Sequence, residues 1–130
     1  MIKKVNMKSE NVIVDKSYKF AIRIIKLYKF LIDDKKEYII SKQILKCGTS
    51  IGANINEAQS AESKMDFIHK LSISAKEIRE TKYWLKLLIE TDYISKKSFD
   101  SINKDCIELM RIINSIILTS KEKIKNLNKL

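Results

Sequence analysis

The central segment of the chain reads Ser41-Lys-Gln-Ile-Leu-Lys-Cys-Gly-Thr-Ser-Ile-Gly-Ala-Asn-Ile-Asn-Glu-Ala58. Its apolar residues recur every three or four positions, which is the period of an amphipathic helix: Ile44, Cys47, Ile51, Ile55 and Ala58. The chain's only two glycines, Gly48 and Gly52, lie one turn apart on one face of this helix. Glycine inside a helix costs roughly 1 kcal/mol relative to alanine. The pair therefore predicts a helix over about 41–60 whose glycine face packs closely against another backbone.

Helical periodicity extends to three other segments, at about 12 or 15 to 32, at 63–91 and at 95–120. The chain of 130 residues has two glycines and no proline, and these two residue types normally mark turns. A serine stands at the expected N-cap position of the last three helices, where its hydroxyl can accept a hydrogen bond from an unpaired amide: Ser41, Ser63 and Ser95. Asp66, three residues after Ser63, completes a capping box.

Short connections between consecutive helices favour antiparallel neighbours. The sequence therefore predicts one all-α domain, an antiparallel up-down-up-down four-helix bundle over residues 12–120. Residues 1–11 are expected to form a flexible N-terminal arm, and 121–130 a basic C-terminal tail.

The net charge of +10 indicates a polyanionic partner, most often nucleic acid. A lysine-rich composition imposed by an AT-rich genome is the alternative explanation. Cys47 and Cys106 are far apart and in no metal-binding spacing, which predicts reduced thiols and a cytoplasmic protein. No run is long and apolar enough for a signal peptide or for a span of about 18 residues, so no membrane association is expected.

The first helix is unusually apolar. On a helical wheel its apolar residues cover about 220°, whereas a helix buried in one monomer core needs a stripe of about 100° or somewhat more. The excess predicts that this helix also contacts another subunit, so the bundle is expected to self-associate.

The remaining arc of the first helix carries the first basic stripe, which we define as Lys16, Lys19, Arg23 and Lys26. A second pair, Lys42 and Lys46, stands one turn apart at the start of the central helix. Phosphate binding requires clustered positive charge and no unique residue type. These six residues are the candidate nucleic-acid-binding residues, and a merely solvated face is the alternative.

Other candidate chemistry fails on residue identity. Ala53 and Asn54 follow the second glycine where a phosphate-binding loop needs Lys-Ser/Thr. His69, three residues after Asp66, resembles half of a carboxylate di-metal motif, but the chain has no second histidine. No nucleophile, base and orienting group can be assembled. We therefore expect no metal, no cofactor and no enzymatic activity.

The segment from Ser41 to Ala58 resembles the hallmark of the bacterial 23S rRNA intervening-sequence proteins, which are four-helix bundles. The run Asp66-Phe-Ile-His-Lys-Leu-Ser-Ile-Ser-Ala-Lys-Glu-Ile-Arg-Glu-Thr-Lys-Tyr-Trp-Leu-Lys-Leu-Leu88 resembles the second signature of that family. The likeness covers roughly residues 12–120. That family is similar to the accessory variability proteins of diversity-generating retroelements, which are basic homopentamers that bind nucleic acid and a reverse transcriptase.

The resemblance implies a homopentamer whose partners are RNA or DNA and a reverse transcriptase or other protein. Together with the charge, it predicts a non-enzymatic, basic, oligomeric protein that binds nucleic acid, associated with an rRNA intervening sequence or a retroelement. The alternative is a structural or protein-interaction scaffold with no direct nucleic-acid role.

Overall fold

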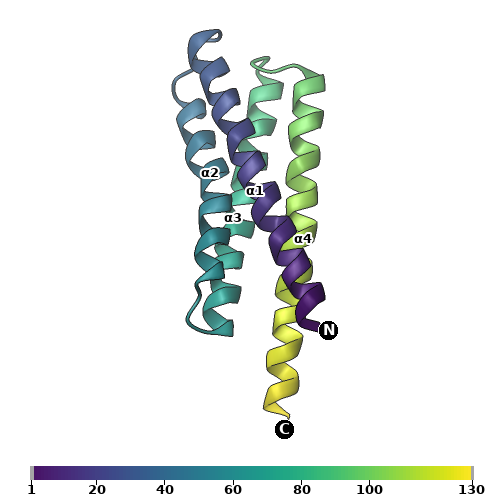
Figure 1. Ribbon diagram of the computed structural model, residues 1–130. Helices are drawn as coiled ribbons and strands as arrows, with labels where there is room; N and C mark the ends of the chain where they lie inside the picture. The colour runs from purple at the N-terminus through teal and green to yellow at the C-terminus, as the bar shows by residue number, and fades with distance from the viewer. Residues whose placement is uncertain (1, 130) are drawn as a thin grey trace.

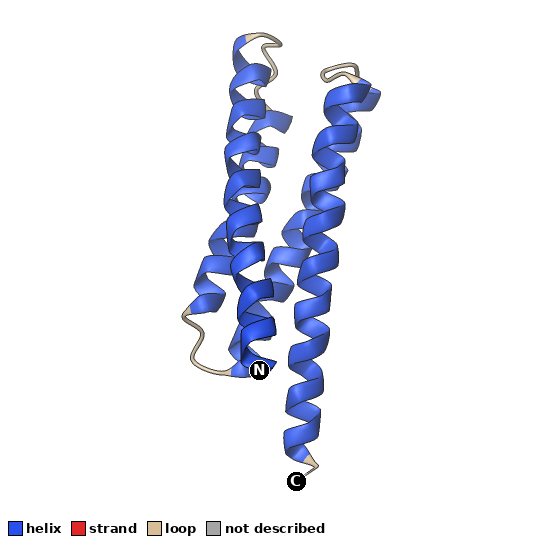
Figure 2. Ribbon diagram, turned by 45° about the vertical axis from the view of Figure 1, so that its right-hand side comes forward, coloured by secondary structure: helices blue, strands red, loops and turns tan. Residues whose placement is uncertain are grey.

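The computed structural model describes residues 2–129, with side chains from Glu10 onward. Four helices follow one another along the chain: α1 (Ile2–Asp33), α2 (Ile40–Gln59), α3 (Lys64–Glu90) and α4 (Lys96–Asn128). They run alternately up and down (Figure 1) and are joined by short loops at the two ends of the bundle (Figure 2). No strand occurs between residues 2 and 129. The predicted all-α up-down-up-down four-helix bundle is confirmed.

Each helix packs against two neighbours: α1 and α3 both contact α2 and α4. Over the described residues, the diagonal pairs α1 with α3 and α2 with α4 make no close backbone approach. The side chains that are completely buried between the four helices are apolar and come from all four. They include Ile13, Ile24, Leu31, Ile44, Ile51, Ile55, Leu71, Ile78, Leu85, Leu88, Leu109 and Ile113.

The first and last helices extend further than the sequence analysis predicted. Helix α1 begins at Ile2 and α4 continues to Asn128, so most of the expected arm and tail is helical. Neither extension contains glycine or proline, and lysine and glutamate are good helix formers, so nothing stops the helix. The end of α4 extends past the other helices, on the side where both termini lie (Figure 1). Met1 and Leu130, the outer ends of the arm and tail, lie outside the described residues.

The glycine face of α2 packs against α1, as the sequence predicted. A Cβ atom built on Gly52 would lie 3.2 Å from the carbonyl oxygen of Ser17. One built on Gly48 would lie 2.7 Å from the side chain of Ile24. On the opposite side of α2, the hydroxyl of Ser74 in α3 donates a hydrogen bond to the carbonyl oxygen of Ile51 at 2.9 Å. Helix α2 is thus held between α1 and α3.

Two of the three predicted serine caps are confirmed. The hydroxyl oxygens of Ser63 and Ser95 accept hydrogen bonds from backbone amides three residues later, at 3.0 and 3.1 Å. The Ser41 cap is wrong, because α2 begins one residue earlier, at Ile40, and Ser41 is buried inside the helix. The Glu37 carboxylate caps α2 instead.

Glu37 is almost fully buried in the α1–α2 connection. Its carboxylate accepts hydrogen bonds from the amides of Ile39, Ile40 and Ser41, at 3.2, 3.0 and 2.7 Å. Burial alone would raise the pKa of this carboxyl, but the backbone donors outweigh it and bring the pKa below its ordinary value. The carboxylate therefore supplies the capping interaction that the sequence analysis assigned to Ser41.

Helix α1 leaves apolar side chains on the face directed away from the bundle. We define the α1 outer stripe as Tyr18, Ile22 and Ile25, which are 63%, 40% and 39% exposed. The three residues follow helical spacing and form one line along the helix. The wide apolar surface expected from the sequence is therefore exposed in the single chain.

Candidate nucleic-acid interface

Two members of the first basic stripe are bound to α4. Lys16 Nζ lies 2.8 Å from Glu108 Oε1, and Arg23 Nη1 lies 2.6 Å from Asp105 Oδ2. Arg23 also donates to the hydroxyl oxygen of Ser101 at 3.0 Å and to its carbonyl oxygen at 3.4 Å. These contacts join α1 to α4 along the edge of the bundle. They place a carboxylate next to each cation that was expected to meet phosphate.

The Lys16–Glu108 pair shows the electrostatic consequence. The hydrogen bond from Lys16, together with its charge, lowers the pKa of Glu108. The same hydrogen bond raises the pKa of Lys16. Both groups therefore stay charged near neutral pH, and their fields largely cancel close to the surface. A phosphate approaching this position would meet an anion as well as a cation.

The other two members of the stripe differ from each other. Lys19 Nζ lies 3.0 Å from Asp15 Oδ2, one helical turn earlier. Lys26 is exposed and forms no ion pair with any described residue. Only one cation of the four is therefore free of a carboxylate partner among the described residues.

The second predicted pair lies on another helix. Lys42 and Lys46 are exposed on α2, whose backbone makes no close approach to that of α4 within the described chain. Burial and the charge of Glu80 raise the pKa of Glu77 on α3 above its ordinary value. The positive charge of Lys46 opposes this rise only in part, as does that of Lys76. The six predicted residues thus form two separate groups rather than one continuous surface.

The carboxylate partners of the first basic stripe were not predicted from the sequence. Asp105 and Glu108 are three residues apart on α4, and Ser101 lies one turn before Asp105. This spacing puts all three side chains on one helix face. Antiparallel neighbours would align that face with a basic stripe on α1. The signal was present in the sequence, but it becomes visible only when the two helices are compared.

A second basic line was also missed, on the outward face of α3. We define the α3 stripe as Lys76, Arg79, Tyr83 and Lys86, all of them exposed. Their spacing of three, four and three residues puts them in one row along the helix. None of the three cations forms an ion pair with a described residue. Helical spacing of charged residues between 76 and 86 could have revealed this row.

Tyr83 gives the α3 stripe an aromatic surface. Its side chain is 58% exposed. The ring meets the indole of Trp84 edge to face, with centroids 5.1 Å apart and planes at 72°. Exposed aromatic rings between cations are the arrangement that proteins use to stack unpaired bases while binding the backbone. The α3 stripe therefore combines both features on one helix.

Other reactive side chains give no catalytic grouping. Burial raises the pKa of Cys47 to about 11 and that of Cys106 to about 12, so both thiols stay protonated at neutral pH. His69 is exposed at the surface of α3. In the part of the chain that the structure describes, no three His, Cys, Asp or Glu residues are grouped as metal ligands. Among the same residues, no helix has the length and apolarity needed to span a bilayer.

The family model described as "23S rRNA-intervening sequence protein" matches residues 9–115. A crystal structure from Bacteroides thetaiotaomicron VPI-5482, described as a protein with unknown function from the S23 ribosomal protein family, is 55% identical, with a TM-score of 0.83. The match covers 84% of this chain and 97% of that one. No curated protein matches the chain.

Proposed function

Because the chain belongs to the 23S rRNA-intervening sequence protein family, we propose that it is a non-enzymatic, self-associating protein that binds nucleic acid. The family description makes RNA the first ligand to test, although the basic surface suits the phosphates of either RNA or DNA. The α3 stripe is the proposed contact surface. In the first basic stripe, Lys16 and Arg23 serve mainly to join α1 to α4.

The observation that carries this proposal is the difference in pairing between the two rows of cations. Lys16, Lys19 and Arg23 each have a carboxylate within ion-pair distance. Lys76 and Arg79 are exposed and have no carboxylate within ion-pair distance among the described residues, although the charge of Lys76 acts on the neighbouring Glu77. Neutralising a phosphate releases condensed counterions, which is the main source of binding free energy for such surfaces. A cation without a carboxylate partner can neutralise a phosphate, and so release counterions, without first breaking an ion pair.

The test is binding to labelled RNA and DNA duplexes by fluorescence anisotropy across a salt series. Each phosphate contact contributes about −0.9 to the slope of log affinity against log salt for duplex DNA. Arg79→Gln with Lys86→Gln should therefore flatten that slope by about 1.8. The matched control, Lys16→Gln with Lys19→Gln, removes the same net charge from paired positions and should change the slope far less. Equal effects would show that net charge alone matters, and would remove the α3 stripe from the proposal.

We also propose that the chain assembles as a homopentamer through the α1 outer stripe. Three half-exposed apolar side chains in one row, rimmed by lysines, are typical of a protein interaction site. A ring of +10 subunits would multiply the positive potential that attracts nucleic acid. Native mass spectrometry should give a mass near five times 15.2 kDa.

The α1 outer stripe can be tested with one matched pair of variants. Ile22→Gln should dissociate the assembly, because it puts a polar group into the proposed interface. Ile107→Gln, at a 53% exposed position on α4, should leave the assembly intact. Dissociation by Ile107→Gln alone would place the interface on α4. A wild-type chain that stays monomeric at micromolar concentration would contradict self-association itself.

A scaffold role without nucleic acid is the second candidate, and the α1 outer stripe favours it because an apolar row can bind another protein. If the chain follows the retroelement accessory proteins, as expected from its sequence, a reverse transcriptase is the partner to test. Two results together would support this candidate over the first. The wild type would bind no nucleic acid even at about 50 mM salt, and it would capture such a partner where Ile22→Gln does not.

A further inference from the structure

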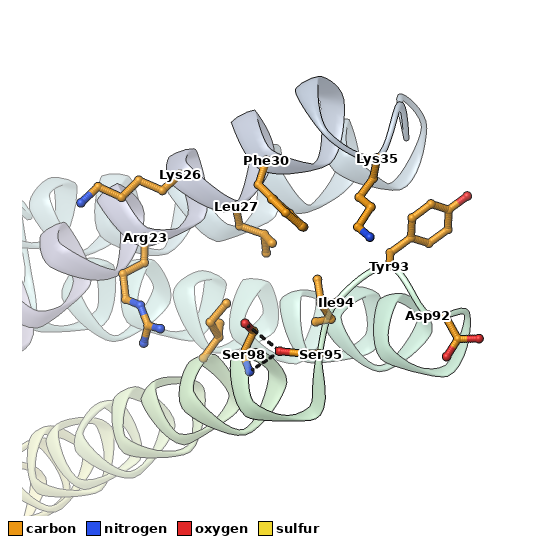
Figure 3. A pocket seen from close by; sticks show the side chains of 11 residues that line it. Arg23, Lys26, Leu27, Phe30, Lys35, Asp92, Tyr93, Ile94, Ser95 and Ser98 are labelled. Atoms are coloured by element: carbon orange, nitrogen blue, oxygen red, sulfur yellow. Dashed lines mark hydrogen bonds between the residues drawn. The ribbon is translucent and has the colours of Figure 1, made fainter.

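A cavity of about 710 Å³ opens between the end of α1 and the start of α4. It lies at the end of the bundle that carries the α1–α2 and α3–α4 loops. Its volume is within the range of about 300–1,000 Å³ that is typical of small-ligand sites. Figure 3 shows side chains from α1, from both loops and from the first turn of α4 around it. No part of the proposed function uses this cavity, and neither the α3 stripe nor the α1 outer stripe contributes to its lining.

The lining of the cavity has an excess of positive charge. It contains Arg23, Lys26 and Lys35 against the single acid Asp92. Figure 3 shows the carboxylate of Asp92 directed away from the other labelled side chains. Arg23 is held by Asp105, whereas Lys26 and Lys35 form no ion pair with any described residue. Figure 3 shows the ammonium group of Lys26 directed away from Phe30 and Lys35, so Lys35 is the cation that is available to an anion beside the aromatic rings.

The rest of the lining is apolar and aromatic. Leu27, Ile94 and Ile102 form a buried floor, and Phe30 and Tyr93 contribute two aromatic rings. Phe30 is 37% exposed, and Lys35 Nζ lies 5.8 Å above its ring centroid. An apolar floor with an aromatic face and an ammonium group directly above it suits a flat ring that carries a negative charge nearby.

Two loop residues hold this lining in place, and both have a left-handed backbone. Asp92 has φ 66° and ends α3 in a Schellman motif, in which the Tyr93 amide donates to the Leu88 carbonyl at 2.9 Å. Lys36 has φ 54° and follows Lys35 directly. Neither position carries glycine, the residue that adopts this conformation without steric cost. Each left-handed residue adjoins a cavity-lining side chain, Tyr93 or Lys35.

We propose that this cavity binds one unstacked nucleotide of a single strand. The base stacks on Phe30 in place of the Lys35 ammonium group and lies against Tyr93, and the phosphate meets that ammonium group beside the hydroxyls of Ser95 and Ser98. The inference rests on the proposed function for its source of nucleotides. A duplex keeps its bases paired and stacked, so it cannot present a base to a cavity of this shape. The cavity would therefore add a preference for single strands to the unselective attraction of the α3 stripe.

The experiment compares a labelled single-stranded RNA of about 12 nucleotides with a duplex of the same length, by fluorescence anisotropy. Phe30→Leu keeps the apolar floor but removes the stacking surface, and Lys35→Gln removes one ammonium group. Base stacking on one aromatic ring corresponds to about 5- to 150-fold in affinity, so Phe30→Leu should weaken single-strand binding by that factor. Duplex binding should stay within about twofold. Tyr38→Leu and Lys104→Gln, an exposed aromatic residue and an exposed lysine outside the cavity, are the matched controls.

A second measurement separates failure of the cavity from failure of the proposed function. Uridine 5′-monophosphate, titrated into the isotope-labelled protein, should shift amide signals of residues 30–36 and 92–98, and Phe30→Leu should abolish these shifts. If the wild type binds RNA but the cavity variants match their controls, the cavity proposal is wrong and the proposed function survives. If no polymer binds, the proposed function is wrong. The mononucleotide titration then decides about the cavity alone: localised shifts support it, and their absence at millimolar ligand overturns it.

Discussion

Helix α1 meets its two neighbours through interfaces of opposite character. Toward α2 it brings Ser17 close to Gly52, where an added methyl group would lie 3.2 Å from a backbone oxygen. Toward α4 it carries Arg23, which reaches Asp105 at 2.6 Å. Ser17 is fully buried, whereas the side chains of Arg23 and Asp105 are 39% and 37% exposed. The contact of α1 with α2 requires that Gly52 has no side chain, whereas charged side chains join α1 to α4 at the edge of the bundle.

The two interfaces should therefore respond differently to mutation. A buried contact against backbone has no room to adjust, because protein interiors are close-packed. An exposed ion pair is weakened by water and salt and can rearrange. We expect the largest effects at the α1–α2 side and the smallest at the α1–α4 side.

The most damaging change should be Gly52→Leu. Its side chain would have to occupy the space where the backbone of α1 passes, and overpacking of this kind costs about 1–3 kcal/mol or more. The matched control is Ala53→Leu, one residue further on the exposed side of the same helix, which should be nearly neutral. Urea denaturation followed by circular dichroism measures both. Equal stabilities of the two variants would mean that α1 does not pack against Gly52.

An intermediate effect is expected at Glu37, which closes the α1–α2 connection. Glu37→Gln keeps the shape of the side chain but weakens its hydrogen bonds to three amides, so it should cost about 1–2 kcal/mol near neutral pH. The folded-state pKa of Glu37 lies below its ordinary value of 4.5. Its contribution is therefore fully present above that value and is lost as the pH falls through the folded-state pKa.

The measurement for Glu37 is the melting temperature of wild type and Glu37→Gln at several pH values. The difference between them should be greatest near neutral pH and should shrink as the pH falls below 4.5, because the carboxylate is protonated first in the unfolded chain and, at lower pH, in the folded one. A difference that stays constant across this range would show that the charge of Glu37 does not cap α2.

The contrast between the two interfaces of α1 also explains which features of the fold could be predicted from the sequence. The α1–α2 contact was predictable because its signal is local: two glycines one turn apart already imply close packing. The cap of α2 was misassigned because a shift of one residue in the helix start moves Ser41 inside and lets Glu37 take its place. Boundaries depend on such small energetic differences, whereas the helical period does not.

The candidate site was harder to predict, because it depends on which helices become neighbours. Clustered cations identified the first basic stripe, but its neutralisation requires Asp105 and Glu108 from a segment more than 80 residues away. The cavity combines α1, two loops and α4, and its lining residues share no pattern within any one segment. The sequence shows where the charged residues are. It does not show which cations are already paired with a carboxylate of another helix and which can still bind a phosphate.

The smallest expected effect belongs to the Arg23–Asp105 pair. A double-mutant cycle with Arg23→Gln and Asp105→Asn should give a coupling of about 0.2–1 kcal/mol, because both side chains are partly exposed. The coupling should fall as salt is raised toward about 1 M, where the Debye length is only about 3 Å. A coupling much above about 1 kcal/mol that salt does not weaken would mean that this edge is as rigid as the α1–α2 side. Arg23 would then be structural. Its charge could not be released to phosphate, and the unpaired cations of the α3 stripe and the cavity would have to provide the electrostatic binding.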